Sequence, residues 1–294
     1  WYDRGQLKPT ARICCAGGMM DPTKRSLTKK GYFSCGLPFT RIGYGPKPLI
    51  IFDGLTFEHK PQPVAMVKMY AFLEVDYTIY SVLRRPQPPK NYSLDDMAND
   101  YAAMIAQEFD PPVDIIGIST GGSVALHFAV LHPQLVRRLV IHSGAHTLND
   151  KAKQLQLDVA HYAKLGQWRR AWKILIASGF PQSGLSFYMA KPLILLGSSL
   201  LSLHHPKSAQ DLIVTVEAED KHAFLDHLKD IQCPSLVVGG EDDYFFSPDL
   251  FEETAAGIPN AKLCLYENMG HPAKGKQFKE DVLRFLVATE KSQK

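Results

Sequence analysis

The feature that most constrains the fold is a regular alternation, from residue 31 onward, of short apolar runs with segments of helical spacing. The segment that starts at Ser93 shows the helical type, because Ser93 is a good N-cap and Asp96 follows three residues later. Uninterrupted apolar strands separated by helices are typical of a parallel sheet covered on both faces. The pattern therefore predicts an α/β fold with a mostly parallel central sheet flanked by helices.

The individual elements follow from the same pattern. The expected strands are Tyr32–Cys35 and Phe39–Ile42, as an antiparallel pair, then Pro48–Phe52, Tyr77–Leu83, Val113–Ile118, Arg138–His142, Ser235–Val238 and Lys262–Tyr266. The expected helices are Val64–Phe72, the segment after Ser93, Ser123–Leu131, the segment after Pro248 and Gln277–Val287.

The alternation breaks between residues 147 and 215, where the spacing is mainly helical. A loop of that length without structure of its own would be unusual inside a compact domain. We therefore expect a helical cap over 147–215, inserted into a core made of residues 31–146 and 216–294. Residues 1–30 are interpreted as a basic extension outside the domain, either not native to the protein or disordered.

Charge and cysteine content exclude several classes. The net charge is +3, but residues 1–30 hold seven Lys or Arg against two Asp, which leaves 26 basic and 28 acidic residues, about −2, elsewhere. The folded body is therefore not expected to bind nucleic acid. Five cysteines, of which only Cys14 and Cys15 are close together, fit neither a disulfide framework nor a zinc site, so we expect reduced thiols and a cytoplasmic location.

The sequence Gly117-Ile118-Ser119-Thr120-Gly121 matches the pattern G-x-S-x-G. It lies between an expected strand and an expected helix, which is the context in which a serine can project from a sharp turn. The flanking glycines allow backbone to approach where a Cβ atom would clash. Ser119 is therefore the predicted nucleophile.

An acid and a histidine should follow the serine in chain order. Asp243 comes after the strand at 235–238, and His271 comes after the strand at 262–266. Both lie past the carboxyl ends of strands, on the sheet edge where Ser119 is expected. His271 would move the Ser119 proton, and Asp243 would orient the imidazole. Asp242 and Asp150 remain alternatives for the acid.

Four segments together resemble the signature stations of the α/β-hydrolase superfamily: residues 50–55, 117–122, 240–243 and 270–271. Within it the chain is similar to serine esterase and lipase-like members that carry a helical cap. The resemblance implies that the backbone N–H groups of Leu55 and Thr120 form an oxyanion hole. Many relatives have His-Gly where this chain has Asp53-Gly54. That departure leaves the role of Asp53 open.

Other polar and apolar features receive plainer interpretations. The histidines at 142, 146 and 161 lack a carboxylate or cysteine at ligand spacing, so no metal is expected. His142 and Ser143 follow a strand and are predicted to line the substrate pocket. The apolar stretch Leu185–Leu203 is interrupted by Lys191-Pro192, so stable membrane insertion is not expected, whereas a cap helix or a homodimer contact is.

These features predict a cofactor-independent hydrolase that cleaves small to medium apolar esters through an acyl-enzyme. The expected partner is a small-molecule ester. The same triad could serve C–C bond hydrolysis, perhydrolysis or acyl transfer. A non-catalytic ligand receptor on a hydrolase scaffold is the remaining alternative.

Overall fold

The computed structural model describes residues 28–180 and 184–287, with the side chains of 184–187 left out. Its centre is an eight-stranded sheet in the order β1-β2-β4-β3-β5-β6-β7-β8. Strand β2 pairs antiparallel with β1 and β4, and the remaining neighbours are parallel. The strands are β1 (Lys29–Tyr32), β2 (Pro38–Gly43), β3 (Lys47–Phe52), β4 (Tyr77–Val82), β5 (Val113–Ile118), β6 (Val136–His142), β7 (Ser235–Gly240) and β8 (Ala261–Tyr266).

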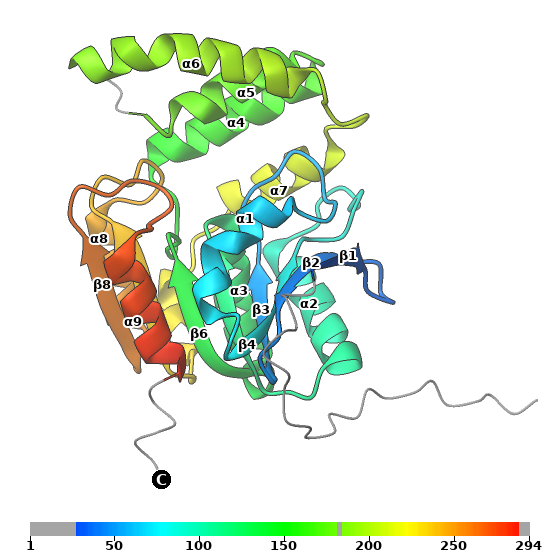
Figure 1. The fold of residues 1–294 in the computed structure, drawn as a ribbon, viewed down its shortest axis with the longest axis vertical. Coiled ribbons are helices and arrows are strands. Elements are labelled where there is room, and N and C mark those ends of the chain that lie inside the picture. The colour runs from blue at the N-terminus through cyan, green and yellow to red at the C-terminus, as the bar shows by residue number, and fades with distance from the viewer. Residues whose placement is uncertain (1–27, 181–183, 288–294) are drawn as a thin grey trace, which may run out of the picture.

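Helices cover both faces of the sheet, because the central strands are apolar on both faces (Figure 1). On β3, Ile50 and Phe52 belong to one core cluster, and Leu49 and Ile51 belong to the other. The first cluster is closed by α2 (Leu94–Glu108), α3 (Thr120–Leu131), α8 (Pro248–Gly257) and the 3-10 helix Leu225–Asp230; the second is closed by α1 (Val64–Val67), the 3-10 helix Lys68–Leu73 and α9 (Lys276–Val287).

The first hairpin differs from the sequence-based expectation. Strand β1 spans Lys29–Tyr32 rather than Tyr32–Cys35, so the sheet includes residues that were assigned to the N-terminal extension. The chain turns at residues 33–37, where Gly36 has φ +89° and the Phe33 N–H bonds to the Leu37 carbonyl at 2.9 Å. Phe33 leaves the strand and packs its ring 4.5 Å from that of Phe39.

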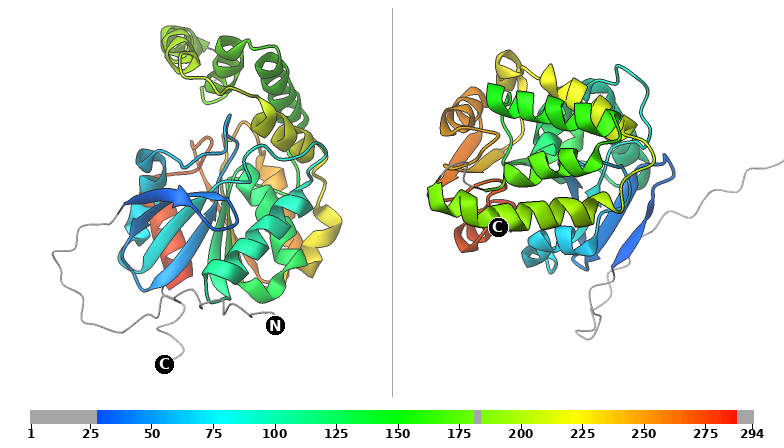
Figure 2. Two further views of the ribbon diagram at one scale, coloured as in Figure 1. Left: turned by 90° about the vertical axis from the view of Figure 1, so that its right-hand side faces the viewer. Right: turned by 90° about the horizontal axis from the view of Figure 1, so that it is seen from above.

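The described residues between β6 and β7 include four α-helices above the carboxyl ends of the strands, of which α4, α5 and α6 form the upper layer and α7 lies nearest the sheet domain (Figures 1 and 2). They are α4 (Asp150–Lys164), α5 (Trp168–Ala177), α6 (Gly184–Ser202) and α7 (Gln210–Asp220). The expected boundary at residue 215 falls inside α7, because this helix contributes Leu212 and Val216 to the cap core and Glu219 to the sheet domain. Phe57, from the loop after β3, stacks on Trp172 of the cap, with the two ring centroids 4.0 Å apart.

The end of the sheet away from the cap is held by one buried carboxylate. Asp114, near the start of β5, accepts hydrogen bonds from both Arg137 and Arg138 of β6 and from the Tyr77 hydroxyl of β4. Burial alone would raise the pKa of Asp114, but the hydrogen bonds from these three donors hold it below its usual value. The carboxylate thus ties together three strands that lie apart in sequence.

We predict that Asp114→Asn lowers the free energy of unfolding by about 3–5 kcal/mol, because it leaves two partly buried guanidinium groups without their anion. The pKa of Asp114 is depressed in the folded state, so its contribution is present above pH ~4 and is lost as the pH falls. Urea unfolding at several pH values measures both effects. Glu280→Gln, which removes an exposed ion pair with Lys276, serves as the control and should cost under ~1 kcal/mol. An Asn variant as stable as the control would contradict this account.

Candidate active site

The carboxyl ends of the parallel strands bring distant residues to one edge of the sheet beneath the cap (Figure 1). Ser119 follows β5, Asp243 follows β7, and His271 follows β8. The loop that starts at Asp53 follows β3. Ser119, His271 and this loop line one cavity of about 670 Å³, together with residues of the cap.

Ser119 occupies a backbone conformation that few non-glycine residues adopt, with φ +53° and ψ −126°. Such a conformation costs on the order of 1–3 kcal/mol and persists only where the surroundings impose it. Close backbone packing imposes the conformation of Ser119. A Cβ atom on Gly121 would lie 1.9 Å from the carbonyl oxygen of Phe52. A Cβ atom on Gly117 would lie 2.5 Å from the carbonyl oxygen of Gly121. The two glycines of the motif therefore permit the turn that projects Ser119.

Asp243 and His271 form a hydrogen-bonded pair. The Nδ1 atom of His271 lies 2.8 Å from Oδ2 of Asp243, whose side chain is fully buried. The other oxygen, Oδ1, accepts the backbone N–H groups of Phe245 at 2.8 Å and Phe246 at 3.2 Å. An ionised carboxylate can only accept, so Nδ1 carries the proton and Nε2 is left able to accept one. The sequence alternatives are both exposed: Asp242 lies on the loop after β7, and Asp150 is the first residue of α4.

The loop after β3 is held by Arg84, a buried residue (2 % exposed) that follows β4. Its guanidinium donates to the carbonyl of Asp53 at 2.7 Å and to that of Gly54 at 2.8 Å. In a trans peptide the C=O and the N–H of one unit point in opposite directions. Because the Gly54 carbonyl faces Arg84, the N–H of Leu55 faces away from it. Leu55 lines the cavity.

Arg84 is itself held by a neutral histidine. Burial, aided by the neighbouring Arg84 charge, lowers the pKa of His59 to about 3. The unprotonated Nε2 of His59 can therefore accept the Nε–H of Arg84 at 3.4 Å, while Nδ1–H donates to the Arg85 carbonyl at 2.8 Å. All three guanidinium nitrogens of Arg84 thus have an acceptor, and two of these acceptors are loop carbonyls.

The same loop passes next to the serine. A Cβ atom on Gly54 would lie 3.3 Å from Cβ of Ser119 and 3.9 Å from its Oγ. On the other side of Ser119, Thr120 is the first residue of α3, so its N–H has no acceptor within the helix. The Leu55 and Thr120 donors expected from the resemblance thus flank Ser119 from two different elements.

A second buried carboxylate supports the start of α3. Glu219 of α7 accepts the hydroxyl of Thr120 at 2.7 Å and that of Ser123 at 3.0 Å. Burial raises the pKa of Glu219 above its usual value, and the two hydroxyl groups oppose that effect. Helix α7 is thereby joined to α3, the helix that follows Ser119.

Asp53, whose role the sequence left open, lies at the cavity wall. Its Oδ2 accepts the hydroxyl of Ser81 at 2.5 Å. Burial raises the pKa of Asp53 from 3.8 to about 7, although Ser81 and the positive charge of Arg84 act in the opposite direction. The carboxyl group therefore changes its charge near neutral pH, two residues before Leu55.

The structure gives His142 and Ser143 a place different from the expected pocket wall. Both are fully buried, and neither is among the residues that line the cavity. His142 Nε2–H donates to the Ala273 carbonyl at 2.7 Å, and Ser143 Oγ accepts the Ala273 N–H at 2.9 Å. The reason is that the loop after β8 folds back over the end of β6. The two residues hold the segment that carries His271.

Tyr70 connects this arrangement to the cavity. Burial lowers the pKa of His142 to about 3, so the ring is neutral and its Nδ1 accepts the Tyr70 hydroxyl at 2.7 Å. Tyr70 lines the cavity, as His142 was expected to do.

The remaining walls of the cavity are mainly apolar, and they come from both layers of the protein. The apolar wall residues are Leu55, Phe57, Met66, Val67, Met69, Trp172, Leu175, Leu201 and Phe245. Within residues 28–180 and 184–287, no group of three or more His, Cys, Asp or Glu residues is arranged to hold a metal ion.

Sequence reasoning missed the buried residues that support the site. Arg84 directly follows an apolar strand, so a charged residue at the carboxyl end of a buried strand was the available signal. His59 and Glu219 lie in segments whose local pattern is that of a surface, and only the tertiary contacts reveal them.

The chain is similar in sequence to known hydrolases. Residues 35–273 match the model of a family described as "Alpha/beta hydrolase family". The chain is 27% identical over 225 residues to the "Putative carbamate hydrolase RutD" of Serratia proteamaculans, covering 70% of this chain and 77% of the relative. It is also 27% identical over 187 residues to a 2-hydroxy-6-oxononadienedioate/2-hydroxy-6-oxononatrienedioate hydrolase of Cupriavidus pinatubonensis, covering 59% and 62%.

Solved structures show the same fold at low identity. The enol-lactonase of Burkholderia xenovorans superposes with a TM-score of 0.69 at 16% identity, covering 88% of this chain and 100% of that one. The esterase EaEST of Exiguobacterium antarcticum superposes with a TM-score of 0.65 at 19% identity, covering 91% and 100%.

Proposed function

The chain belongs to the alpha/beta hydrolase family, and on that premise we propose that it is a serine hydrolase of carboxylic esters. The observation that carries the proposal is the convergence of three groups at one cavity: the strained Ser119, the His271–Asp243 pair and the loop held by Arg84. A receptor that only binds a ligand would need neither the strained serine nor the buried acid behind the histidine.

The proposed reaction has two steps. Nε2 of His271 accepts the Ser119 proton as Oγ attacks the ester carbonyl, and the same proton then passes to the departing alcohol. In the second step His271 takes a proton from water, whose oxygen attacks the acyl-enzyme carbonyl. The carboxylic acid leaves as the proton returns to Ser119. Asp243 keeps the Nδ1–H tautomer of His271 throughout, and neither step needs a cofactor.

Each tetrahedral intermediate carries a negative oxygen that needs donors already in place. The N–H groups of Leu55 and Thr120 are proposed to supply them. Arg84 acts as a positioning residue, because it fixes the Gly54 carbonyl and thereby turns the Leu55 N–H toward the cavity. Glu219 is proposed to be the positioning residue for Thr120, because it accepts the Thr120 hydroxyl.

The cavity supports an apolar substrate of small to medium size. Its volume of about 670 Å³ lies within the range of sites for small molecules, and its walls are mainly apolar. Helix α5 of the cap contributes Trp172 and Leu175 to these walls, so the insertion limits the length of the acyl or alcohol group.

Carbamate or C–C bond hydrolysis is the second candidate, favoured by the names of the two relatives from Serratia and Cupriavidus. Both reactions also attack a carbonyl carbon, so the same triad and donors would serve them. Perhydrolysis and acyl transfer would differ only in the nucleophile of the second step.

We predict that a fluorophosphonate labels the wild-type protein at Ser119 in a one-to-one ratio. Ser119→Ala should abolish labelling, and His271→Ala should slow it strongly, because no group then takes the serine proton. Asp243→Asn should lower kcat by about 10⁴-fold. Asp242→Asn, at the exposed neighbour, is the matched control and should retain most of the activity.

Substrate class is read from a parallel panel of p-nitrophenyl esters of graded chain length, an aryl carbamate and a 2-hydroxy-6-oxo-dienoate. Turnover of the esters, with a maximum at short or medium chains, supports the proposal. Labelling of Ser119 without ester turnover would favour one of the other acyl reactions. A protein that is never labelled would overturn the hydrolase mechanism.

We predict that Arg84→Lys lowers kcat by about 10²–10³-fold with little change in KM, because a lysine cannot hold both loop carbonyls and the Leu55 donor is lost. Steady-state kinetics on the best ester give the split between kcat and KM. Arg85→Lys is the matched control, since Arg85 pairs with Asp100 on the surface. Equal kcat values for the two variants would exclude a positioning role for Arg84.

The charge of Asp53 predicts a pH dependence. Above pH ~7 the Asp53 carboxylate is ionised, and its negative charge opposes the oxyanion that forms at the Leu55 N–H. The kcat value should therefore decline as the pH rises through about 7. Asp53→Asn should remove this alkaline decline while leaving an acceptor for Ser81. The pH–rate profile of kcat tests it, with Asp226→Asn at an exposed position as control. A decline that persists unchanged in Asp53→Asn would show that another group causes it.

A further inference from the structure

One polar corner of the catalytic cavity has no contact with the substrate in the proposed ester hydrolysis. It consists of Asp53 just after β3, Ser81 of β4 and Tyr70 of the 3-10 helix Lys68–Leu73, and all three residues line the cavity. In a pocket whose other walls are mainly apolar, a small number of placed polar groups usually fixes the orientation of a ligand. We call this set of three residues the acidic corner.

The hydroxyl protons of the acidic corner are already committed. The Ser81 hydroxyl donates to Oδ2 of Asp53 at 2.5 Å. The Tyr70 hydroxyl donates to Nδ1 of His142 at 2.7 Å, and that neutral ring directs its one N–H to the Ala273 carbonyl. A hydroxyl group has one proton, and an ionised carboxylate has none. With Asp53 ionised, the acidic corner can therefore only accept hydrogen bonds from a group in the cavity.

One acceptor of the acidic corner is open to such a group. Oδ2 of Asp53 is held by Ser81, whereas Oδ1 has no hydrogen-bond partner in the part of the chain that the structure describes. Oδ1 is not one of the atoms that are buried without a partner, and Asp53 is partly exposed where it lines the cavity. The acidic corner thus presents a carboxylate oxygen to the cavity, and the complementary group is a hydrogen-bond donor.

The charge at the cavity wall is negative. Besides Asp53, the acidic and basic residues that line the cavity are Glu58 and Lys60. Both are exposed, and they pair with each other at 2.6 Å. The histidines that line the cavity are His204 and His271. Asp53 therefore supplies the one carboxylate of the described wall that no cation at the wall balances.

The buried groups that support the site leave this balance negative. Arg84 contributes one positive charge, and Asp53, Glu219 and Asp243 contribute one negative charge each when they are ionised, so the sum is +1 − 3 = −2. Burial lowers the pKa of the neighbouring His59 and His142 to about 3, so these rings are neutral. A cation in the cavity is therefore attracted by the groups around it.

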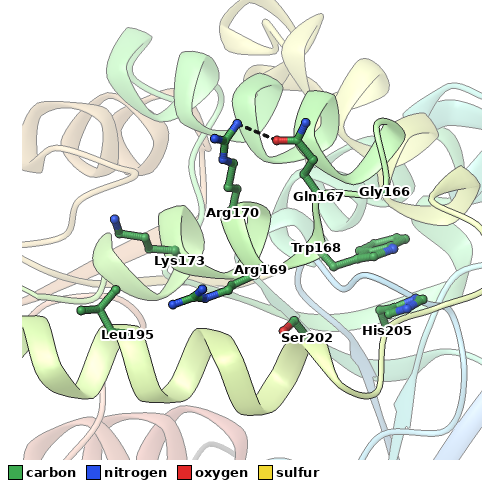
Figure 3. Close-up of a pocket in the computed structure, with 9 residues that line it drawn as sticks. All are labelled: Gly166, Gln167, Trp168, Arg169, Arg170, Lys173, Leu195, Ser202 and His205. Atoms are coloured by element: carbon green, nitrogen blue, oxygen red, sulfur yellow. Dashed lines mark hydrogen bonds between the residues drawn. The ribbon is translucent and has the colours of Figure 1, made fainter.

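The basic side chains of the cap do not offset this charge at the cavity wall. Arg169, Arg170 and Lys173 of α5 border a different hollow, between α5 and α6, which shares no lining residue with the catalytic cavity. Figure 3 shows Arg169 and Lys173 at that hollow, opposite Leu195 and Ser202.

We propose that Asp53 binds a positively charged amine of the substrate, whose N–H donates to Oδ1. The amine supplies both the donor that the acidic corner lacks and a charge opposite to that of the carboxylate. Ser81 holds Oδ2 and thereby fixes the carboxylate that receives the amine. Hydrogen bonds between charged partners are the strong ones, so one such contact can select a substrate. The substrate class is an otherwise apolar ester that carries one amine.

Asp53 is close enough to the nucleophile for one small molecule to reach both. Gly54, the next residue, lies against Ser119, because a Cβ atom on Gly54 would lie 3.9 Å from the serine Oγ. Consecutive Cα atoms are about 3.8 Å apart, so Asp53 is one residue removed from that contact. This inference rests on the proposed function, since it names the substrate class of the same cavity.

Two pairs of isosteric esters test the proposal, because each pair exchanges a dimethylammonium group for an isopropyl group. The amine is on the alcohol side in 2-(dimethylamino)ethyl butanoate, whose isostere is 3-methylbutyl butanoate. It is on the acyl side in methyl 4-(dimethylamino)butanoate, whose isostere is methyl 5-methylhexanoate. The Ser119→Ala variant binds esters without turnover, so calorimetry on this variant gives the Kd of each ester and the ratio within each pair.

We expect at least one amine ester to bind about 10–100-fold more tightly than its isostere at pH ~8. This preference should decline as the pH falls through about 7, because Asp53 then gains a proton and loses its charge. Adding Asp53→Asn to Ser119→Ala should reduce the preference about tenfold or more at pH ~8. The neutral isostere should bind both variants alike, which shows that the cavity is intact.

The control is Asp226→Asn in the same background, which removes an exposed carboxylate away from the cavity and should leave the preference unchanged. His271 lines the same cavity, and its protonation would also disfavour a cation at low pH. A pH dependence of the preference that persists in Asp53→Asn would therefore assign the effect to His271 and overturn the role of Asp53.

Turnover of the same esters by the wild type separates this proposal from the proposed function. The preferred amine ester should lack the alkaline decline of kcat, because its charge cancels that of Asp53. Turnover of the neutral esters without an amine preference in either pair, or with an equal preference in Asp53→Asn, would overturn the amine site and leave the hydrolase standing. An amine preference that Asp53→Asn abolishes, with no ester turnover and no labelling of Ser119, would count against the hydrolase and leave the amine site standing.

Discussion

The close approach between the end of β3 and the start of α3 is the constraint on which the site depends. The backbone of Phe52 leaves no space for a side chain at Gly121, and Gly121 in turn limits Gly117. Ser119 is held between these two contacts in its strained conformation. The same approach brings the loop that begins at Asp53 next to Ser119, so one packing contact places both Ser119 and the loop with the proposed Leu55 donor.

Buried ionisable groups fix the elements around this contact. Arg84 holds the loop after β3, and Glu219 holds the start of α3. At the opposite end of the sheet, Asp114 joins β4, β5 and β6. Each group is costly to bury and is therefore paired or hydrogen-bonded.

The cap has two sides with different properties. Its inner side supplies apolar walls such as Trp172 and Leu175 to the cavity, and Glu219 of α7 accepts hydrogen bonds from α3. Its outer side carries exposed apolar side chains on α6, such as Leu193, Leu196 and Leu200. The inner side thus forms a wall of the cavity, and the outer side leaves apolar surface exposed.

Much of this molecule was determined by the sequence alone. Apolar runs such as Val113–Ile118 predicted the parallel sheet, because a strand buried on both faces needs apolar side chains throughout. The motif at 117–121 and the positions of Asp243 and His271 predicted which residues meet, since parallel strands end at one edge. Only the tertiary structure revealed that Arg84, His59 and Glu219 support them, and that His142 and Ser143 hold the histidine loop. Such roles depend on contacts between residues far apart in the chain, which no local pattern records.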